Sequence, residues 1–369
     1  MKIGIITLSA SYNCGSLLQG YALKKILEKY GETEIINFTS EKSEKLYSIV
    51  PDSIYGKIRV LCRRRNLLEE LKTEKRAYID FQKNALELSD EKYYADDLYK
   101  ISEQYDLIVA GSDQIWNVSM GDFDVSFFAG WTSKRKVAYA PSLGGHDIRD
   151  SVNARRYIEL IKEFSDVSVR EEQGKKCLET ILGKNILKVA DPTLLYGSEQ
   201  WKKLIGKPYV EGEFIFFYSW SYGCDELRKI VSERSRITGN PVYVIDAHKW
   251  RIHSYKRDGF ALCDQAGPLA FLNLMYYAKE CFVESFHGMM FAYIFKKNFW
   301  LLDNYENSEH MDSRLKELVM LFDVGNRVLT KFNIKKTDME QQIEYRNNPN
   351  LNELLKISND YLERVITDQ

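Results

Sequence analysis

Short apolar runs of strand length alternate with helical segments along this chain, in two separate series. The first series starts with an isoleucine-rich run at residues 2–8, followed by a helix predicted over 16–31 and a strand predicted over 34–38. A continuous apolar run is typical of a strand that is covered on both faces of a parallel sheet. The order strand, helix, strand therefore predicts an α/β fold with a parallel sheet.

Further apolar runs predict strands over 105–110, 136–139 and 166–169, and a fourth that ends near Pro192. A second series begins at Phe214, with strands predicted in 214–220, 241–248, 281–284 and 299–303 and helices in 225–238, from Gly267, and in 289–295. We predict two Rossmann-like lobes facing a cleft, one over 1–196 and one over 212–330. The polar tail, 331–369, is predicted to be helical and to pack back on the first lobe.

The balance of charge excludes strong electrostatic attraction to nucleic acid. The 369 residues include 52 basic and 53 acidic side chains, and the net charge is −1. We interpret the run Arg63–Arg65 as a solvated helix face. None of the six cysteines forms a CxxC pair, which favours a reducing cytoplasm over a disulfide scaffold. His248 and His253 lack further ligands at suitable spacing, so we predict no metal site.

The sequence also argues against export and against a membrane span. The apolar run at the N-terminus turns polar at Ser9, too early for a signal peptide. No stretch reaches the roughly 20 apolar residues that a spanning helix needs. We therefore expect a cytoplasmic protein.

Two side chains at predicted strand ends are candidates for chemistry. His287 lies between the strand at 281–284 and a predicted helix, where an imidazole can act as a general acid near neutral pH or simply cap the helix. Arg170 ends the strand at 166–169, where a guanidinium can hold a carboxylate or phosphate. The alternative for Arg170 is an internal salt bridge to Glu171 or Glu172.

Two polar loops also follow predicted strands, and such loops bind ligands in open α/β sheets. SYNCGSLLQG offers Asn13 and Ser16 beside Gly15, with a helix N-cap as the alternative. GSDQIWN offers Ser112, Asp113, Trp116 and Asn117, with Trp116 stacking on a sugar or, alternatively, lying in the core.

Several stretches resemble the polysaccharide pyruvyl transferase family. They are SYNCGSLLQGYAL, DLIVAGSDQIWN, VAYAPSLGG, SVREE, VADPTLL, ESFHGMMFAYIFKKNFW and SRLKEL, in the family's order. The resemblance implies a GT-B-like fold, phosphoenolpyruvate as the donor, a sugar as the acceptor and a pyruvate ketal as the product. It implies no cofactor, with phosphoenolpyruvate acting as a co-substrate.

The resemblance also implies roles for residues. The family's histidine falls on His287 and its arginine on Arg170, and the usual aspartate before SFHG is replaced here by Glu284. We predict His287, Arg170 and Glu284 as catalytic. The predicted donor-binding residues, in the second lobe except for Arg170, are Arg170, Ser285, His287, Gly288 and Arg314. The predicted acceptor-binding residues, in the first lobe, are Asn13, Gly15, Ser16, Ser112, Asp113, Trp116 and Asn117.

Two other functions remain open at this point. The same fold hosts nucleotide-sugar glycosyltransferases, and a family member without catalysis would bind a glycan or an anion in the same place. If the acceptor is lipid-linked, we expect peripheral contact with a membrane face and no membrane span.

Overall fold

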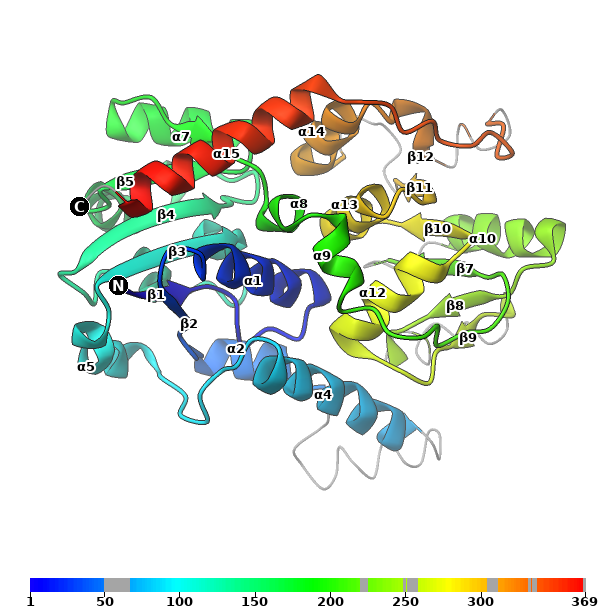
Figure 1. The fold of residues 1–369 in the computed structure, drawn as a ribbon, viewed down its shortest axis with the longest axis horizontal. Helices are drawn as coiled ribbons and strands as arrows, with labels where there is room; N and C mark the ends of the chain where they lie inside the picture. Colours follow the sequence, from blue (N-terminus) through cyan, green and yellow to red (C-terminus); the bar gives the residue numbers. More distant parts are fainter. Residues whose placement is uncertain are drawn as a thin grey trace. The chain divides into compact units, whose positions relative to one another are not determined.

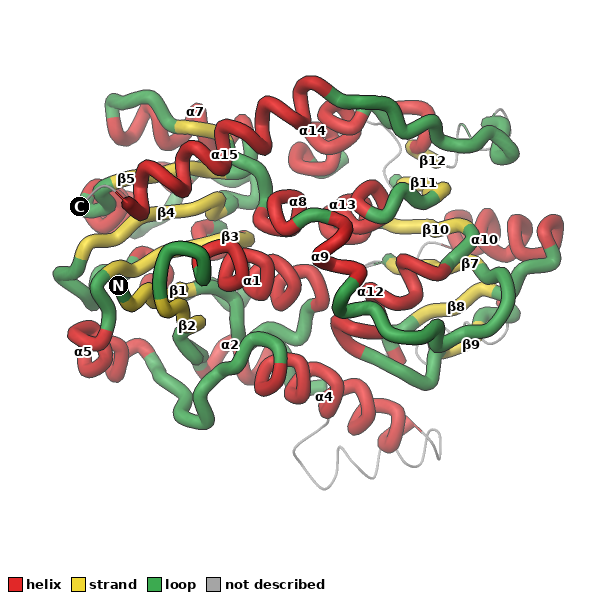
Figure 2. The backbone as a smooth tube through the Cα atoms, in the orientation of Figure 1, coloured by secondary structure: helices red, strands yellow, loops and turns green. Residues whose placement is uncertain are grey.

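The computed structural model describes residues 1–49, 67–219, 225–247, 250, 258–303, 311–330, 333 and 337–367. The chain divides into two compact units (Figure 1). Unit 1 comprises Met1–Tyr47, Asp80–Gly197 and Pro349–Gln369, and unit 2 comprises Ser48–Ile79 and Ser198–Asn348. Each unit holds a sheet together with helices (Figure 2), so the predicted two-lobe α/β class is confirmed.

The sheet of unit 1 is parallel throughout, in the order β2-β1-β3-β4-β5-β6. Its strands are β1 (Lys2–Ile6), β2 (Glu32–Ile35), β3 (Leu107–Asp113), β4 (Arg135–Pro141), β5 (Asp166–Val169) and β6 (Leu187–Lys188). All of β3 is buried, as its apolar sequence predicts for a central strand. The parallel register places the carboxyl ends of β1, β3, β4 and β5 at one edge of the sheet.

The predicted strand over 34–38 is shifted, because β2 ends at Ile35. Ile36 N still donates to Ile5 O of β1 at 2.9 Å, but the following residues bond elsewhere. Asn37 O accepts from Tyr93 N at 2.9 Å, and Thr39 N donates to Tyr93 O at 3.0 Å. A contact distant in the sequence therefore takes the end of this strand away from the sheet.

Unit 1 contains both long and short helices. They are α1 (Cys14–Leu27), α2 (Glu41–Leu46), α5 (Leu98–Ile101), α6 (Ala154–Lys162), α7 (Glu172–Leu182), α8 (Pro192–Tyr196) and α15 (Pro349–Thr367), with 3₁₀ turns at Ala95–Asp97, Ser102–Gln104, Gln114–Trp116, Val125–Phe128 and Ile148–Asp150. The helix α4 (Leu67–Asn84) contains the boundary between the units, after Ile79.

Helix α1 is buried on nearly every side, so each polar residue within it needs a partner. Lys24 Nζ donates to Leu86 O at 3.0 Å and pairs with Glu87. Gln19 Nε2 donates to Thr7 Oγ1 at 3.0 Å. The bond from Gln19 to Thr7 holds the first half of α1 beside the end of β1.

The sheet of unit 2 is also parallel, in the order β12-β11-β10-β7-β8-β9. Its strands are β7 (Ile215–Tyr218), β8 (Val242–Val244), β9 (Ala261–Leu262), β10 (Glu280–Val283), β11 (Asn298–Leu302) and β12 (Val328–Leu329). Its helices are α9 (Ser198–Lys202), α10 (Asp225–Thr238), α12 (Gly267–Tyr277), α13 (Phe286–Ile294) and α14 (Ser313–Phe322), with a 3₁₀ turn at Gly325–Arg327. Pro268 lies in the first turn of α12, where proline is tolerated, as predicted.

The C-terminal tail differs from the prediction. Among the tail residues that the structure describes, only α15 is helical, and residues 337–348 form no helix. The buried Arg327 donates through Nη2 to Gln341 O at 2.7 Å, and Arg234 donates to Met339 O at 3.2 Å. Carbonyls that a helix would use internally therefore bind side chains of unit 2.

Helix α15 packs on unit 1, as predicted for the tail. Tyr361 Oη donates to Ala138 O of β4 at 2.9 Å, and Ser358 Oγ accepts from Ala190 N at 2.7 Å.

The predicted domain boundaries also need correction. Ser48–Ile79 belongs to unit 2 rather than to the first lobe, and Leu67 and Leu71 of α4 cluster with Ala247. The chain passes into unit 2 after Gly197.

The run Arg63–Arg65 and the pair His248 and His253 lie outside the described residues. No described helix is both long and apolar enough to cross a bilayer.

Candidate functional site

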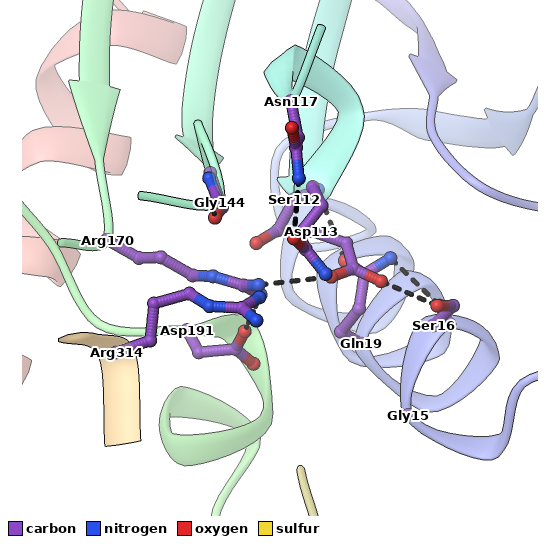
Figure 3. Close-up of polar contacts among 12 residues, drawn as sticks. Gly15, Ser16, Gln19, Ser112, Asp113, Asn117, Gly144, Arg170, Asp191 and Arg314 are labelled. Atoms are coloured by element: carbon purple, nitrogen blue, oxygen red, sulfur yellow. Dashed lines mark hydrogen bonds and ion pairs between the residues drawn. The ribbon is translucent and has the colours of Figure 1, made fainter. Parts of the chain in front are cut away.

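Arg170 lies between two carboxylates at the carboxyl edge of the unit 1 sheet (Figure 3). Nη1 donates to Asp191 Oδ2 at 2.7 Å, and Nη2 donates to Asp113 Oδ1 at 3.0 Å. The side chains of Arg170 and Asp191 are each 2% exposed, and that of Asp113 is 6% exposed. Burial alone would lower the pKa of Arg170, but the carboxylates of Asp113, Asp191 and Glu171 outweigh it and raise that pKa.

The salt bridge to Glu171 that the sequence left open for Arg170 is present as a long ion pair. Two shorter ion pairs, to Asp113 and Asp191, come in addition and were not expected from the sequence. Glu171 Oε2 is farther away, 3.9 Å from Nε. Each terminal nitrogen of Arg170 therefore donates to a buried carboxylate of unit 1.

Asp113 connects this ion pair to α1. Its Oδ2 accepts from Ser16 Oγ at 2.6 Å, and the residue has a positive φ of 70°. That backbone conformation is unfavourable for a residue with a Cβ, and the bonds to Ser16 and Arg170 hold it in place. Ser16, Asp113 and Arg170, from three separate sequence motifs, are thus brought together.

Gln19 is a residue of this edge that the sequence analysis missed. Its Oε1 accepts from Ser112 N at 3.1 Å, and its Nε2 donates to Ser16 O at 2.8 Å. Ser112 is fully buried and its Oγ donates to Ala140 O at 2.8 Å. The signal was present, since Gln19 is a lone amide among apolar residues of α1.

The Asn13 side chain caps α1, which is the alternative that the sequence left open. Its Oδ1 accepts from Gly15 N at 2.9 Å and from Ser16 N at 3.3 Å. Gly15 supplies its backbone N–H to that cap and is buried in the helix.

Glu171 organises the loop that follows β4. Its Oε1 accepts from Ser142 Oγ at 2.8 Å, Leu143 N at 2.7 Å and Gly144 N at 3.2 Å. That loop packs against Asn117, whose Nδ2 donates to Gln114 Oε1 at 2.9 Å. A Cβ on Gly144 would come within 2.1 Å of Asn117 Nδ2, so only glycine fits there.

Replacing Gly144 by alanine is expected to disturb the position of Asn117. Gly144 and Gly183 both have positive φ, 65° and 63°, but a Cβ on Gly183 meets nothing within 4 Å. Gly183→Ala is therefore the matched control and should cost about 1 kcal/mol. Gly144→Ala should cost about 1–2 kcal/mol more in urea unfolding, because of the clash. Equal losses would contradict the contact with Asn117.

Trp116 does not lie where it could stack on a sugar. Its ring is fully buried, packs against Phe128 and Phe164, and donates through Nε1 to Phe127 O at 3.3 Å. The assignment of Trp116 to acceptor binding is wrong, because a fully buried ring has no free face; its place is in the core.

In unit 2, the polar candidates gather at the N-terminus of α13. Ser285 caps the helix by accepting from Gly288 N at 2.9 Å, and His287 follows in the first turn, partly exposed. A Cβ on Gly288 would lie 2.8 Å from Ser285 Oγ and 3.2 Å from Val283 Cβ. The close approach of the cap therefore requires glycine, and the helix N-terminus carries partial positive charge.

Glu284 and Arg314 flank this helix N-terminus. The carboxylate of Glu284 accepts a hydrogen bond from Ser219, and its backbone N donates to Tyr218 O at 3.1 Å. The guanidinium carbon of Arg314 lies 5.9 Å from the ring centroid of Phe286, the neighbour of His287. Arg314 Nε donates to Asp312 Oδ1 at 3.0 Å.

The candidates therefore form two groups, one in each unit. Unit 1 holds the predicted acceptor-binding residues together with Arg170, and unit 2 holds Glu284 and the other predicted donor-binding residues. Within the described part of the chain, no three His, Cys, Asp or Glu side chains are placed to hold a metal ion.

Two parallel sheets with polar residues at their carboxyl edges define a two-lobe α/β protein of the Rossmann-like type. The chain belongs to the polysaccharide pyruvyl transferase family, whose model matches residues 13–307. A search of curated proteins finds no match.

Solved structures with the same fold share little sequence with this chain. The UDP-GlcNAc 2-epimerase of Methanocaldococcus jannaschii is 14% identical with a TM-score of 0.55, and the match covers 100% of both chains. The Rickettsia bellii UDP-N-acetylglucosamine 2-epimerase is 12% identical with a TM-score of 0.55, covering 100% of this chain and 96% of the other. S. aureus MnaA, solved with UDP, is 12% identical with a TM-score of 0.54, covering 98% and 97%. Likeness at this level shows the fold alone.

Proposed function

We propose that this protein transfers the pyruvyl group of phosphoenolpyruvate to two hydroxyls of one sugar and forms a pyruvate ketal in exopolysaccharide or other cell-surface polysaccharide synthesis. The family match over residues 13–307 is the observation that carries the proposal. We assign this reaction to the cytoplasm, and the protein contacts a membrane face if the acceptor is lipid-linked.

The reaction balances without a redox partner. A proton adds to the CH₂ carbon of phosphoenolpyruvate, and the resulting oxocarbenium-like carbon is attacked by one sugar hydroxyl. The C–O bond to phosphate then breaks, and phosphate leaves as a second hydroxyl of the same sugar attacks that carbon. The two hydroxyl protons are released, one replacing the proton consumed and one leaving with phosphate.

The N-terminus of α13 is assigned to the donor. Ser285 and Gly288 shape the end of the helix, whose N–H groups favour an anion such as the phosphate or carboxylate of phosphoenolpyruvate. Arg314, beside Phe286, adds a cation to the same place. His287 is the general acid that protonates carbon or the departing phosphate, and Glu284 orients it.

The carboxyl edge of unit 1 is assigned to the acceptor. Asp113 and Asn117 offer oxygen and amide groups for sugar hydroxyls. Arg170 acts here as a positioning residue for Asp113, because its two terminal nitrogens bond to Asp113 and Asp191. A clamp for the donor anion, the role that the sequence suggested for Arg170, is the alternative.

The first test is a thermal-shift titration with phosphoenolpyruvate. A ligand at about 100 times its dissociation constant should add about 2.7 kcal/mol to the apparent stability. We expect the shift to disappear in Arg314→Met and to persist in Arg236→Met. Arg236 is a matched control, because it is an exposed arginine of α10 that is paired only with its helical neighbour Glu233 among the described residues.

Product formation then separates the three candidate functions. Phosphate release that requires an acceptor, with a new ketal methyl signal by NMR, supports pyruvyl transfer. A shift with a nucleoside diphosphate but none with phosphoenolpyruvate would favour a nucleotide-sugar glycosyltransferase of the same fold. Saturable binding without product over long incubation would favour a family member that only binds an anion or glycan.

A further inference from the structure

A second buried carboxyl group in unit 1 lacks the partners that surround Asp113. Asp122 is 1% exposed, and its Oδ2 accepts from Tyr47 Oη at 2.5 Å. Its Oδ1 is buried and has no hydrogen-bond partner among the described residues. A buried carboxylate oxygen without a donor is energetically costly, so native structures rarely keep one without a reason.

The contrast with Asp113 is chemical. Asp113 accepts from Ser16 and pairs with Arg170, so its negative charge is compensated. Asp122 forms no ion pair with any lysine or arginine in the described ranges. The structure therefore stabilises a negative charge on Asp113 and leaves that of Asp122 uncompensated.

The groups that face Asp122 act on it in opposite directions. Burial raises the pKa of Asp122 most, the hydrogen bond from Tyr47 and the interaction with its own backbone N–H lower it, and the charge of Asp113 raises it, with a raised pKa as the result. Burial, followed by Asp122 itself, raises the pKa of Tyr47, so this phenol keeps its proton and remains a donor. Carboxyl groups with a raised pKa in polar sites are frequent among catalytic bases.

Tyr47 is the hydrogen-bond partner of Asp122 that reaches the surface. Tyr47, at the C-terminal end of α2, is partly exposed, whereas Asp122 is not. The ring of Tyr12, also partly exposed, lies 6.5 Å from that of Tyr47 between centroids. Two neighbouring aromatic rings beside a phenol hydroxyl are a surface suited to a sugar.

We propose that Tyr47 and Asp122 form the proton acceptor for the attacking sugar hydroxyl. Tyr47 Oη takes the proton of the sugar hydroxyl as it passes its own proton to Asp122 Oδ2, and the sugar oxygen forms its bond to the oxocarbenium-like carbon. Asp122 is left protonated and tyrosine is unchanged; the proton then leaves with phosphate. This inference rests on the proposed function and adds the acceptor-side base to it.

The test compares Asp122→Asn and Tyr47→Phe with the wild type in acceptor-dependent phosphate release. Each should lower kcat about 10²–10⁴-fold, because general-base catalysis has that size. The thermal shift with phosphoenolpyruvate should be unchanged, since both residues are assigned to the acceptor. In the wild type, kcat should increase with pH as Asp122 loses its proton. This increase should be absent in Asp122→Asn.

Asp124→Asn is the matched control, because Asp124 caps the next 3₁₀ turn by accepting from Ser126 N and asparagine caps equally well. It should leave the rate unchanged.

Thermal stability supplies a readout that does not depend on turnover. An aspartate with a raised pKa destabilises the folded state once pH exceeds that pKa. At pH 8, the melting temperature of Asp122→Asn should therefore be no lower than that of the wild type. Any gain in melting temperature should disappear near pH 4, where Asp122 of the wild type is protonated. A purely structural role would lower both melting temperature and rate.

The two proposals fail in different ways. Wild type that makes no ketal overturns the proposed function and this inference with it. Wild type that makes ketal while Asp122→Asn retains its rate within about twofold overturns this inference alone.

Discussion

Replacing Arg170 by methionine should lower the free energy of unfolding by about 3–5 kcal/mol at pH 7, measured by urea unfolding. The substitution leaves the buried carboxylates of Asp113, Asp191 and Glu171 without their common cation. Methionine keeps the apolar length of the side chain, so the loss reports charge rather than volume.

The pH dependence of this loss has a definite sign. Without Arg170, the buried side chains of Asp113 and Asp191 lose their common cation, and burial without a cation raises the pKa of a carboxyl group above its unfolded value near about 4. Stability contributed by a group with a raised pKa is present at low pH and is lost as pH rises through the folded pKa. The deficit of Arg170→Met should therefore be largest at pH 7–8 and shrink toward pH 4–5.

Two further variants make this result specific. Adding Asp113→Asn to Arg170→Met should recover part of the loss, because one uncompensated charge is removed. Arg364→Met is the control, since Arg364 of α15 is 49% exposed in its ion pair with Asp166 and should cost at most about 1 kcal/mol. Equal deficits at pH 5 and pH 8 would contradict a charge-based role for Arg170.

Replacing His287 by glutamine should reduce pyruvyl transfer about 10²–10⁴-fold, the usual contribution of a general acid. Glutamine keeps a polar side chain in the first turn of α13, where Ser285 still caps the helix. The measurement is acceptor-dependent phosphate release at saturating phosphoenolpyruvate, with urea unfolding to confirm that the fold is kept.

His146→Gln is the control for this prediction, because His146 is exposed in a loop of unit 1. It should leave the rate unchanged. A His287→Gln enzyme with the wild-type kcat/KM would remove His287 from the chemistry, and the donor assignment of α13 would then depend on Arg314 and the helix N-terminus alone.

The two groups of candidate residues lie in different units. The residues proposed for the donor at α13 belong to unit 2, and Arg170, beside Asp113, belongs to unit 1. The same division explains why Arg170 and His287 are expected to affect different measurements, stability in one case and turnover in the other.

The sequence alone determined the α/β class, most strands and the helix that begins near Pro268, and it offered the Asn13 cap of α1 as one of two alternatives. Strand burial and helix capping are local properties: an apolar run such as β3, or an Asn13 whose oxygen accepts from residues two and three positions later, carries its own signal. The same pattern of strands also predicted the edge of each sheet at which the polar loops lie.

Only the tertiary structure decided how the polar residues are paired. Arg170 meets Asp113 across 57 residues and Asp191 across 21, and Tyr47 meets Asp122 across 75. Which carboxylates surround a buried cation, and which carboxylate is left without one, depends on strand order and loop packing rather than on neighbours in the chain. Trp116 shows the same limit, because a tryptophan at a strand end suits a sugar or a core equally well until the surrounding rings are in place.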